Sequence, residues 1–255
     1  MDSLPPKYLY RYMKVDEYCR KLIVEHEVSF TCRRNLNDPF DSKIHYTYDT
    51  YREKNPEYLS RLLDTIEPPL TQDRKYRILN NMLAHPKPIE PLVEELTSKM
   101  RDEVNVCGLL CFSEESDNLL LWAHYAKFHT GICLRFVVDI EHDFYQDLYN
   151  VRYSENVPLV DLLDGDGEAH LEVFKTKAAI WSYEKEWRII RPDMIVDRGL
   201  YASIGFPIDL MDRIILGSQI SEENKQKILD WVGQQKIEVV NSEEVEGEFR
   251  LRIPD

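Results

Sequence analysis

The sequence predicts an α+β domain with a central mixed or antiparallel sheet, helices packed around it, and a helical insertion at about residues 55–102. Apolar and alternating runs of strand length recur along the chain, and apolar stripes at helical spacing lie between them. In 55–102 the stripes are all helical, and prolines separate them. The 255 residues, 43% of them hydrophobic and 11% aromatic, are expected to form a single domain, 1–255, with a well-filled core.

Composition argues against several functional classes. A net charge of −14 disfavours broad nucleic-acid binding, which depends on attraction to phosphates. Only nine glycines, with neither a Walker-type loop nor a dinucleotide fingerprint, disfavour a glycine-rich phosphate loop. Five scattered cysteines suit the reduced thiols of a cytosol and include no matched pairs for zinc, so no metal is expected. Because no signal peptide or membrane-length apolar run is present, we expect a cytoplasmic protein without a membrane partner.

The first expected element is a strand, Tyr8–Met13. Its three tyrosines alternate onto one face, and Arg11 falls on the other face between Leu9 and Met13. An unpaired guanidinium among apolar neighbours is costly. Arg11 therefore needs either an acidic partner or an anionic ligand.

A helix, a strand and a polar loop are expected next. Asp16 is a suitable N-cap for a helix, and Val28–Cys32 is a short strand. The segment 35–41, NLNDPFD, is a loop because its proline disfavours helix at the preceding residue. This loop either packs as a structural turn or edges a pocket with Asn37 and Asp38. The insertion that follows is poor in catalytic residue types.

The run Val104–Phe112 is apolar throughout and predicts a central strand buried on both faces. It ends at Ser113, and Ser116 or Asp117 is expected to cap a buried helix, 118–128. Tyr125 and His129 share one stripe of this helix, while His124 faces away. The two histidines therefore form no metal pair, and each is either a hydrogen-bonded structural residue or part of a pocket.

The rest of the chain alternates short strands and helices. Expected strands lie at 132–138, 151–153, 200–204, 213–216, 237–240 and 249–253, and expected helices lie at 168–177 and after a cap at Ser221.

The segment 179–192, AIWSYEKEWRIIRP, is the most informative stretch. A strand over 181–190 places Glu184, Glu186 and Arg188 on one side, opposite Trp187 and Ile189 on the core side. The acids either form a solvated face partly neutralised by the neighbouring cations or provide an active-site carboxylate tuned by its neighbour.

Five motifs in a fixed order carry a resemblance to a known family. LYRY, NDPFD, CFSE, LWAHYA and WSYEKEWR together resemble the bacterial proteins grouped as domain of unknown function 2971. The resemblance extends from Leu9 to about Gly217, apart from the insertion, and Leu121 stands where these proteins usually carry methionine. That family has no settled activity, so the resemblance identifies relatives rather than a reaction.

A more distant resemblance concerns mechanism. ADP-ribosyltransferase-like folds carry an arginine or histidine on the first strand, a serine or tyrosine on a later strand, and a Glu-x-Glu pair near the end. Arg11, Ser113 and Glu184-x-Glu186 occur here in that order, without a Ser-Thr-Ser triplet. The resemblance implies that Arg11 holds the NAD phosphates and that Ser113 supports the sugar or the glutamate. Glu186 would stabilise the oxocarbenium-like centre, and Glu184 would orient or deprotonate the acceptor.

The sequence thus supports two functional hypotheses. The first is an NAD-dependent ADP-ribosyltransferase or NAD glycohydrolase, with a role in bacterial defence or stress response, NAD as substrate and an acceptor that the sequence does not specify. The second is a non-catalytic ligand-binding or interaction module in which Arg11, Glu184 and Glu186 form a buried ion-pair network. A metal-dependent nuclease is disfavoured by the acidity and the lack of a suitable acidic motif. The proposed catalytic residues are Glu186, Glu184, Arg11 and Ser113, and the proposed ligand-binding residues are Asn37, Asp38, His124, Tyr125, His129, Trp181 and Arg188.

Overall fold

The computed structural model has an α+β fold built on a seven-stranded mixed sheet with the strand order β13-β12-β5-β1-β4-β10-β6. It describes residues 4–47, 56–64, 69–84, 90–161, 167–195 and 201–254. β12 and β13 run parallel, and the other neighbours in this sheet are antiparallel. The predicted fold class is confirmed. The strands of the sheet are β1 (Tyr8–Met13), β4 (Cys107–Ser113), β5 (Ile132–Val137), β6 (Leu148–Asn150), β10 (Glu186–Ile195), β12 (Met211–Leu216) and β13 (Glu238–Asn241).

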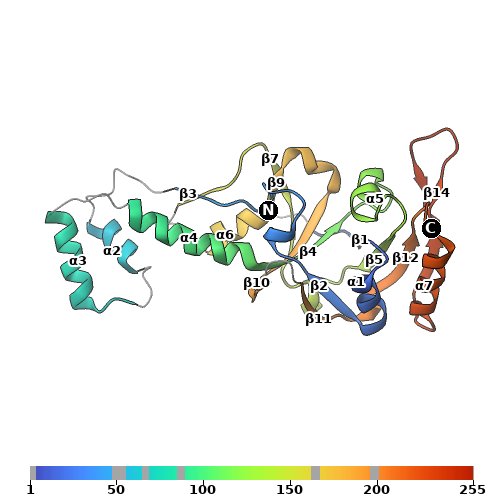
Figure 1. The fold of residues 1–255 in the computed structure, drawn as a ribbon, viewed down its shortest axis with the longest axis horizontal. Helices are drawn as coiled ribbons and strands as arrows, with labels where there is room; N and C mark the ends of the chain where they lie inside the picture. The colour runs from blue at the N-terminus through green and yellow to red at the C-terminus, as the bar shows by residue number, and fades with distance from the viewer. Residues whose placement is uncertain are drawn as a thin grey trace.

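The rest of the described chain forms helices and short strand pairs (Figure 1). The helices are α1 (Glu17–Arg20), α2 (Pro56–Asp64), α3 (Gln72–Ala84), α4 (Glu90–Val106), α5 (Leu119–Tyr125), α6 (Gly167–Phe174) and α7 (Glu222–Val232). The short pairs are β2 (Glu27–Phe30) with β11 (Ala202–Gly205), β3 (His45–Thr47) with β8 (Leu159–Asp161), β7 (Arg152–Ser154) with β9 (Thr176–Ala178), and β14 (Glu243–Glu244) with β15 (Leu251–Arg252). None of the described helices is long and apolar enough to cross a lipid bilayer.

The helical insertion is present, and its last helix is longer than expected. Helices α2 and α3 lie at one end of the molecule, and α4 leads back to the sheet (Figure 1). Residues 55, 65–68 and 85–89 of the expected insertion lie outside the described residues. Helix α4 continues through Val106, so the predicted strand at 104–112 begins only at Cys107. An apolar run of this kind suits either a helix or a strand. Val104 lies on helix α4 and is buried in the same cluster as Ile190 of the sheet.

The sheet is buried on both faces. A large core on one face includes Phe112 of β4 and Trp187 and Ile189 of β10. The opposite face carries two smaller cores, one under α4 and α6 that includes Ile190, and one under α5 that includes Trp122. This alternation matches the expected strand period over the second half of 181–190.

Capping residues fix where the helices begin. The Asp16 carboxylate accepts the backbone N–H groups of Tyr18 and Cys19, as predicted, and Ser221 caps α7. Helix α5 is capped by Asn118 rather than by Ser116 or Asp117. It ends at Tyr125 instead of residue 128, because residues 127–129 all have positive φ angles and cannot continue a right-handed helix.

The predicted strand at 181–190 is wrong in its first half. Residues Ala179–Glu184 form a 3-10 helix, and Lys185 has a left-handed conformation with φ 43°. The strand β10 begins only at Glu186. Glu184 is therefore carried by the end of a helical turn rather than by a strand, and Tyr183 lies outside the core.

Candidate functional site

The site lies where two neighbouring strands separate. β1 and β4 share a single register pair, Tyr10 with Ser113. Four residues earlier on β4, Leu109 instead bonds to Thr31 through two backbone hydrogen bonds of 2.7 and 2.9 Å. The carbonyl group of Cys111, between these points, accepts a 2.9 Å hydrogen bond from the Arg11 side chain. The Arg11 side chain thus bonds to β4 at Cys111, between the positions where β4 pairs with Tyr10 and with Thr31.

A cavity of about 490 Å³ opens at this separation. This size falls within the range of small-molecule sites. Arg11, Ser113, Glu184 and Glu186 all line it, so the residues predicted to be catalytic share one hollow. The other lining residues are Tyr10, Tyr12, Lys14, Thr31, Asn35, Leu36, Asn37, Asp41, Cys111, Phe112, Leu121, His124, Tyr125, Lys177 and Tyr201.

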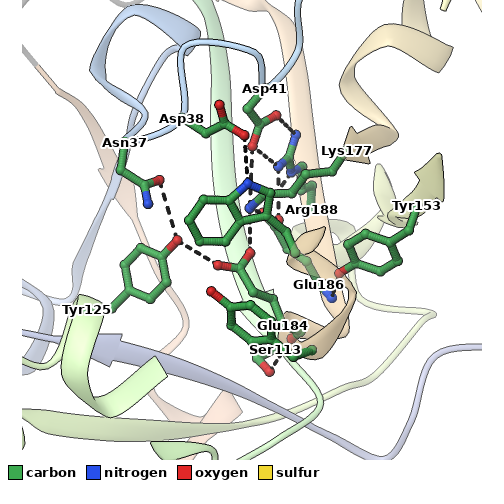
Figure 2. A network of polar contacts seen from close by, with 12 residues as sticks. Asn37, Asp38, Asp41, Ser113, Tyr125, Tyr153, Lys177, Glu184, Glu186 and Arg188 are labelled. Carbon is green, nitrogen blue, oxygen red and sulfur yellow. Dashed lines mark hydrogen bonds and ion pairs between the residues drawn. The ribbon is translucent and has the colours of Figure 1, made fainter. Parts of the chain in front are cut away.

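A buried ion-pair network forms one wall of the cavity (Figure 2). Arg188 is fully buried and donates two hydrogen bonds of 2.8 and 2.6 Å to the two carboxylate oxygens of Asp41. It donates two more, of 2.7 and 2.9 Å, to Glu186. The Nη1 atom of Arg188 also donates to the hydroxyl group of Ser42 and to the carbonyl group of Phe174. Every nitrogen of the guanidinium is satisfied, so Arg188 organises the wall and does not line the cavity.

Lys177 joins the two glutamates. Its ammonium group lies 2.8 Å from Glu186, is hydrogen-bonded to Glu184, and lies 3.4 Å from Asp41. Burial disfavours the charged amine, but the surrounding carboxylates outweigh this and raise the pKa of Lys177 above its usual value. The positive charge of Lys177 allows the carboxylates of Glu184 and Glu186 to lie close together although both are buried.

The two glutamates are electrostatically different. Burial alone would raise the pKa of Glu186, but Arg188 and Lys177 together hold it well below its usual value of 4.5. Among the described residues, Lys177 is the one cationic partner of Glu184. Burial, together with the nearby charge of Glu186, raises the pKa of Glu184. The hydroxyl group of Tyr125 also donates a 2.8 Å hydrogen bond to Glu184. Glu186 is thus a fully compensated anion, and Glu184 is the carboxyl group better suited to exchange a proton.

Arg11 lies on the same cavity without a carboxylate partner among the described residues. One of its terminal nitrogens bonds to Cys111, and its buried Nε atom has no hydrogen-bond partner. Burial lowers the pKa of Arg11 from its usual value, with no acid to restore it. The sequence left open an acidic partner or an anionic ligand, and the described residues contain no such acid.

Ser113 positions the segment that carries Glu184. Its hydroxyl group donates a 2.6 Å hydrogen bond to the carbonyl oxygen of Glu184 and accepts the N–H group of Glu115. Ser113 is also paired in register with Glu186 on the neighbouring strand β10. The N–H group of Glu186 in turn donates to the hydroxyl group of Tyr153.

The remaining predicted ligand-binding residues fall into two groups. Asn37, His124 and Tyr125 line the cavity. Asp38 and Trp181 stand outside its lining and bond to each other, with the indole N–H group donating to the carboxylate at 2.7 Å. His129 is also outside the lining and stacks on Trp122, with ring centroids 6.1 Å apart.

Sequence reasoning did not select Asp41 or Lys177 as site residues. Asp41 is the last residue of the NDPFD motif, which was one of the patterns that carried the family resemblance. Lys177 is the last residue of the expected helix 168–177 but lies on strand β9, and only its buried position beside the two glutamates distinguishes it from a surface lysine. The motif could have identified Asp41, whereas no sequence signal identifies Lys177.

The cavity lining therefore combines the Arg11 guanidinium, which has no carboxylate partner among the described residues, with the Glu184 carboxyl group, whose pKa is raised. Asp41, Glu184 and Glu186 are balanced by Arg11, Lys14 and Lys177 among the lining side chains. Within the described ranges there is no cluster of three or more His, Cys, Asp or Glu residues suited to a metal ion. Such a cavity suits a ligand that carries both an anionic and a cationic group. No family model, curated protein or solved structure matches this chain.

Proposed function

We propose that the cavity binds NAD or a closely similar dinucleotide and that the protein cleaves its nicotinamide–ribose bond. The observation that carries this proposal is that one cavity holds both Arg11, which has no carboxylate partner in the described part of the chain, and Glu184, whose pKa is raised. A guanidinium suits a pyrophosphate because it forms charge-assisted, forked hydrogen bonds. A nearby carboxyl group suits the positive charge that develops at the ribose.

The proposed roles of the two glutamates are those that the resemblance implies. Breaking the bond between the ribose carbon and the nicotinamide nitrogen leaves the electron pair on nicotinamide and a cationic sugar. Water or an acceptor nucleophile then forms the new bond to that carbon, and its proton passes to the Glu184 carboxylate. Glu186 is bonded to Arg188 and Lys177, so it contributes fixed negative charge beside the reacting centre. Ser113 holds the backbone of Glu184 in place.

A role in bacterial defence or stress response, in the cytoplasm, is part of this proposal. The acceptor is then water in a glycohydrolase or a macromolecule in a transferase. Both reactions use the same residues up to the point at which nicotinamide leaves.

The second candidate function is a non-catalytic nucleotide-binding module. The completeness of the ion-pair network favours it, because Arg188, Asp41 and Lys177 are each at least 95% buried and Asp41 is paired with both cations. Such a network holds the loop 35–41 and the 3-10 turn against the sheet without any reaction. In this function Arg11 still binds the anionic ligand.

Release of free nicotinamide from NAD tests the first candidate against the second. We expect the unmodified chain to release nicotinamide and Glu184→Gln to lose at least about a hundred-fold in rate, as is typical when general acid–base catalysis is removed. Glu243→Gln is a matched control, because Glu243 forms an exposed pair with Arg252 outside the cavity. ADP-ribose binding should persist in both variants.

Two results would contradict the proposal. No nicotinamide release, with ADP-ribose still raising the melting temperature, would favour the binding module. Unchanged turnover in Glu184→Gln would remove Glu184 from the reaction. The melting temperature of each variant, measured without ligand, separates these outcomes from a failure to fold.

A further inference from the structure

A second hollow adjoins the cavity. It has a volume of about 500 Å³ and is lined by Lys14, Val15, Asp16, Ala123, His124, Lys127 and Phe128. Lys14 and His124 line both hollows, so the two hollows adjoin at these side chains. Glu184 and Glu186 line only the first, and Lys127 and Phe128 line only the second. A ligand anchored at Arg11 could extend past Lys14 to Lys127.

The second hollow is positively charged in a strongly acidic protein. Lys14 and Lys127 have no carboxylate partner among the described residues. Asp16, the one acid in the lining, has its carboxylate engaged by two backbone N–H groups at the start of α1. Two lysines without a carboxylate partner among the described residues therefore line this hollow, and one of them, Lys14, also lines the cavity that contains Arg11.

The turn that carries Lys127 has an unusual backbone. Lys127, Phe128 and His129 have consecutive φ angles of 48°, 56° and 65°, a conformation that residues with side chains rarely adopt. Packing explains only part of it, since His129 stacks on Trp122 while Phe128 is 78% exposed. The turn leaves a lysine and an exposed aromatic ring side by side on the hollow. Observed strain of this kind often accompanies a functional site.

An ammonium group and an aromatic face together suit a phosphorylated nucleoside. Lysine binds phosphate as a point charge, and an exposed aromatic ring provides a surface on which a base can stack. A phosphate monoester on the adenosine ribose of a dinucleotide lies next to its adenine ring. Lys127 and Phe128 are adjacent in the same way.

We infer that the hollow between Lys14 and Lys127 binds an additional phosphate group, so that the preferred ligand is a dinucleotide with a phosphate monoester on its adenosine ribose. This inference rests on the proposed function, because it extends the ligand outward from Arg11. NADP is then a better substrate than NAD. Arg11 holds the pyrophosphate, and Lys14 lies between the two anionic groups.

Calorimetric titration with ADP-ribose and with 2′-phospho-ADP-ribose at one fixed ionic strength tests the inference, because neither compound can lose nicotinamide. We expect the phosphorylated compound to bind at least about ten-fold more tightly. Lys127→Met should reduce or remove this preference while changing ADP-ribose affinity by less than about two-fold, because Lys127 lines only the second hollow. Lys14→Met should also reduce the preference, but it should weaken ADP-ribose as well, because Lys14 lines both hollows. Lys236→Met is a charge-matched control, because Lys236 lines neither hollow.

Equal affinities for the two compounds, or a preference that survives in both lysine variants, would overturn the inference and leave NAD cleavage standing. If neither compound binds the unmodified chain, the proposed function fails instead. In that case, titration of the same variants with inorganic pyrophosphate tests whether the second hollow binds an anion, independently of the proposed function. Pyrophosphate binding that is lost in the lysine variants supports the anion site, and binding that is absent or unchanged overturns it.

Discussion

Arg188 and Asp41 form a forked pair, with two parallel hydrogen bonds of 2.8 and 2.6 Å between side chains 147 positions apart in the chain. Neither side chain is more than 2% exposed. This pair fixes the NDPFD loop to strand β10. The pair also joins the rest of this wall of the cavity, because Glu186 is bonded to Arg188 and Lys177 is paired with Asp41.

Asp41→Asn should therefore destabilise the protein strongly. Removing one charge from a buried pair leaves its partner uncompensated and typically costs about 3–5 kcal/mol. We expect a loss of this size in the free energy of unfolding, measured by urea denaturation. Glu248→Gln is the control, since its pair with Arg250 is more than half exposed and should change stability by less than about 1 kcal/mol. A loss below about 1 kcal/mol in Asp41→Asn would show that the network does not hold the loop.

Glu186→Gln should weaken the dependence of stability on acid. Because the pKa of Glu186 in the folded state lies below 4.5, its stabilisation is complete above that pH and is lost as the pH falls toward the folded-state pKa. Each proton taken up on unfolding contributes a slope of about 1.4 kcal/mol per pH unit. Urea denaturation between pH 6 and 3 should give the variant a slope smaller by up to one proton. Identical slopes in both proteins would contradict the low pKa.

Arg11→Met should separate binding from stability. The change removes a charged hydrogen-bond donor from the ligand, so affinity for ADP-ribose should fall by about 10- to 100-fold. Because Arg11 has no carboxylate partner among the described residues, no acid is left uncompensated and the loss of stability should be smaller than for Asp41→Asn. Titration calorimetry and urea denaturation measure the two quantities. Unchanged affinity would show that the ligand, if one binds, does not use Arg11.

Gly217→Ala should disrupt the strained turn beside the second hollow. A β-carbon on Gly217 would lie 2.1 Å from the carbonyl oxygen of His129, which is a backbone atom. We expect a loss of more than about 1 kcal/mol in the free energy of unfolding. Gly205→Ala is the matched control, because its added β-carbon would meet nothing within 4 Å and should change stability by no more than about 0.5 kcal/mol. Equal effects of the two changes would mean that the close approach at Gly217 relaxes at little cost.

Local sequence signals located most of the elements around the site. The alternation in Tyr8–Met13, the caps at Asp16 and Ser221, and the proline-separated helices of the insertion all have local physical causes. Errors occurred where one pattern suits two structures. The apolar residues before Cys107 end a helix instead of beginning a strand, and the residues before Glu186 form a 3-10 turn.

The sequence by itself determined the α+β fold class and placed Arg11, Ser113 and the two glutamates on separate elements of it, and it predicts that Arg11 needs an acidic partner or an anionic ligand. The tertiary structure alone decided that β1 and β4 separate, that Asp41 and Lys177 complete the wall, and that Glu184 rather than Glu186 keeps the higher pKa. Helix caps and strand alternation depend on residues a few positions apart. Charge compensation in a buried wall depends instead on which distant side chains meet, and here those side chains are up to 147 residues apart.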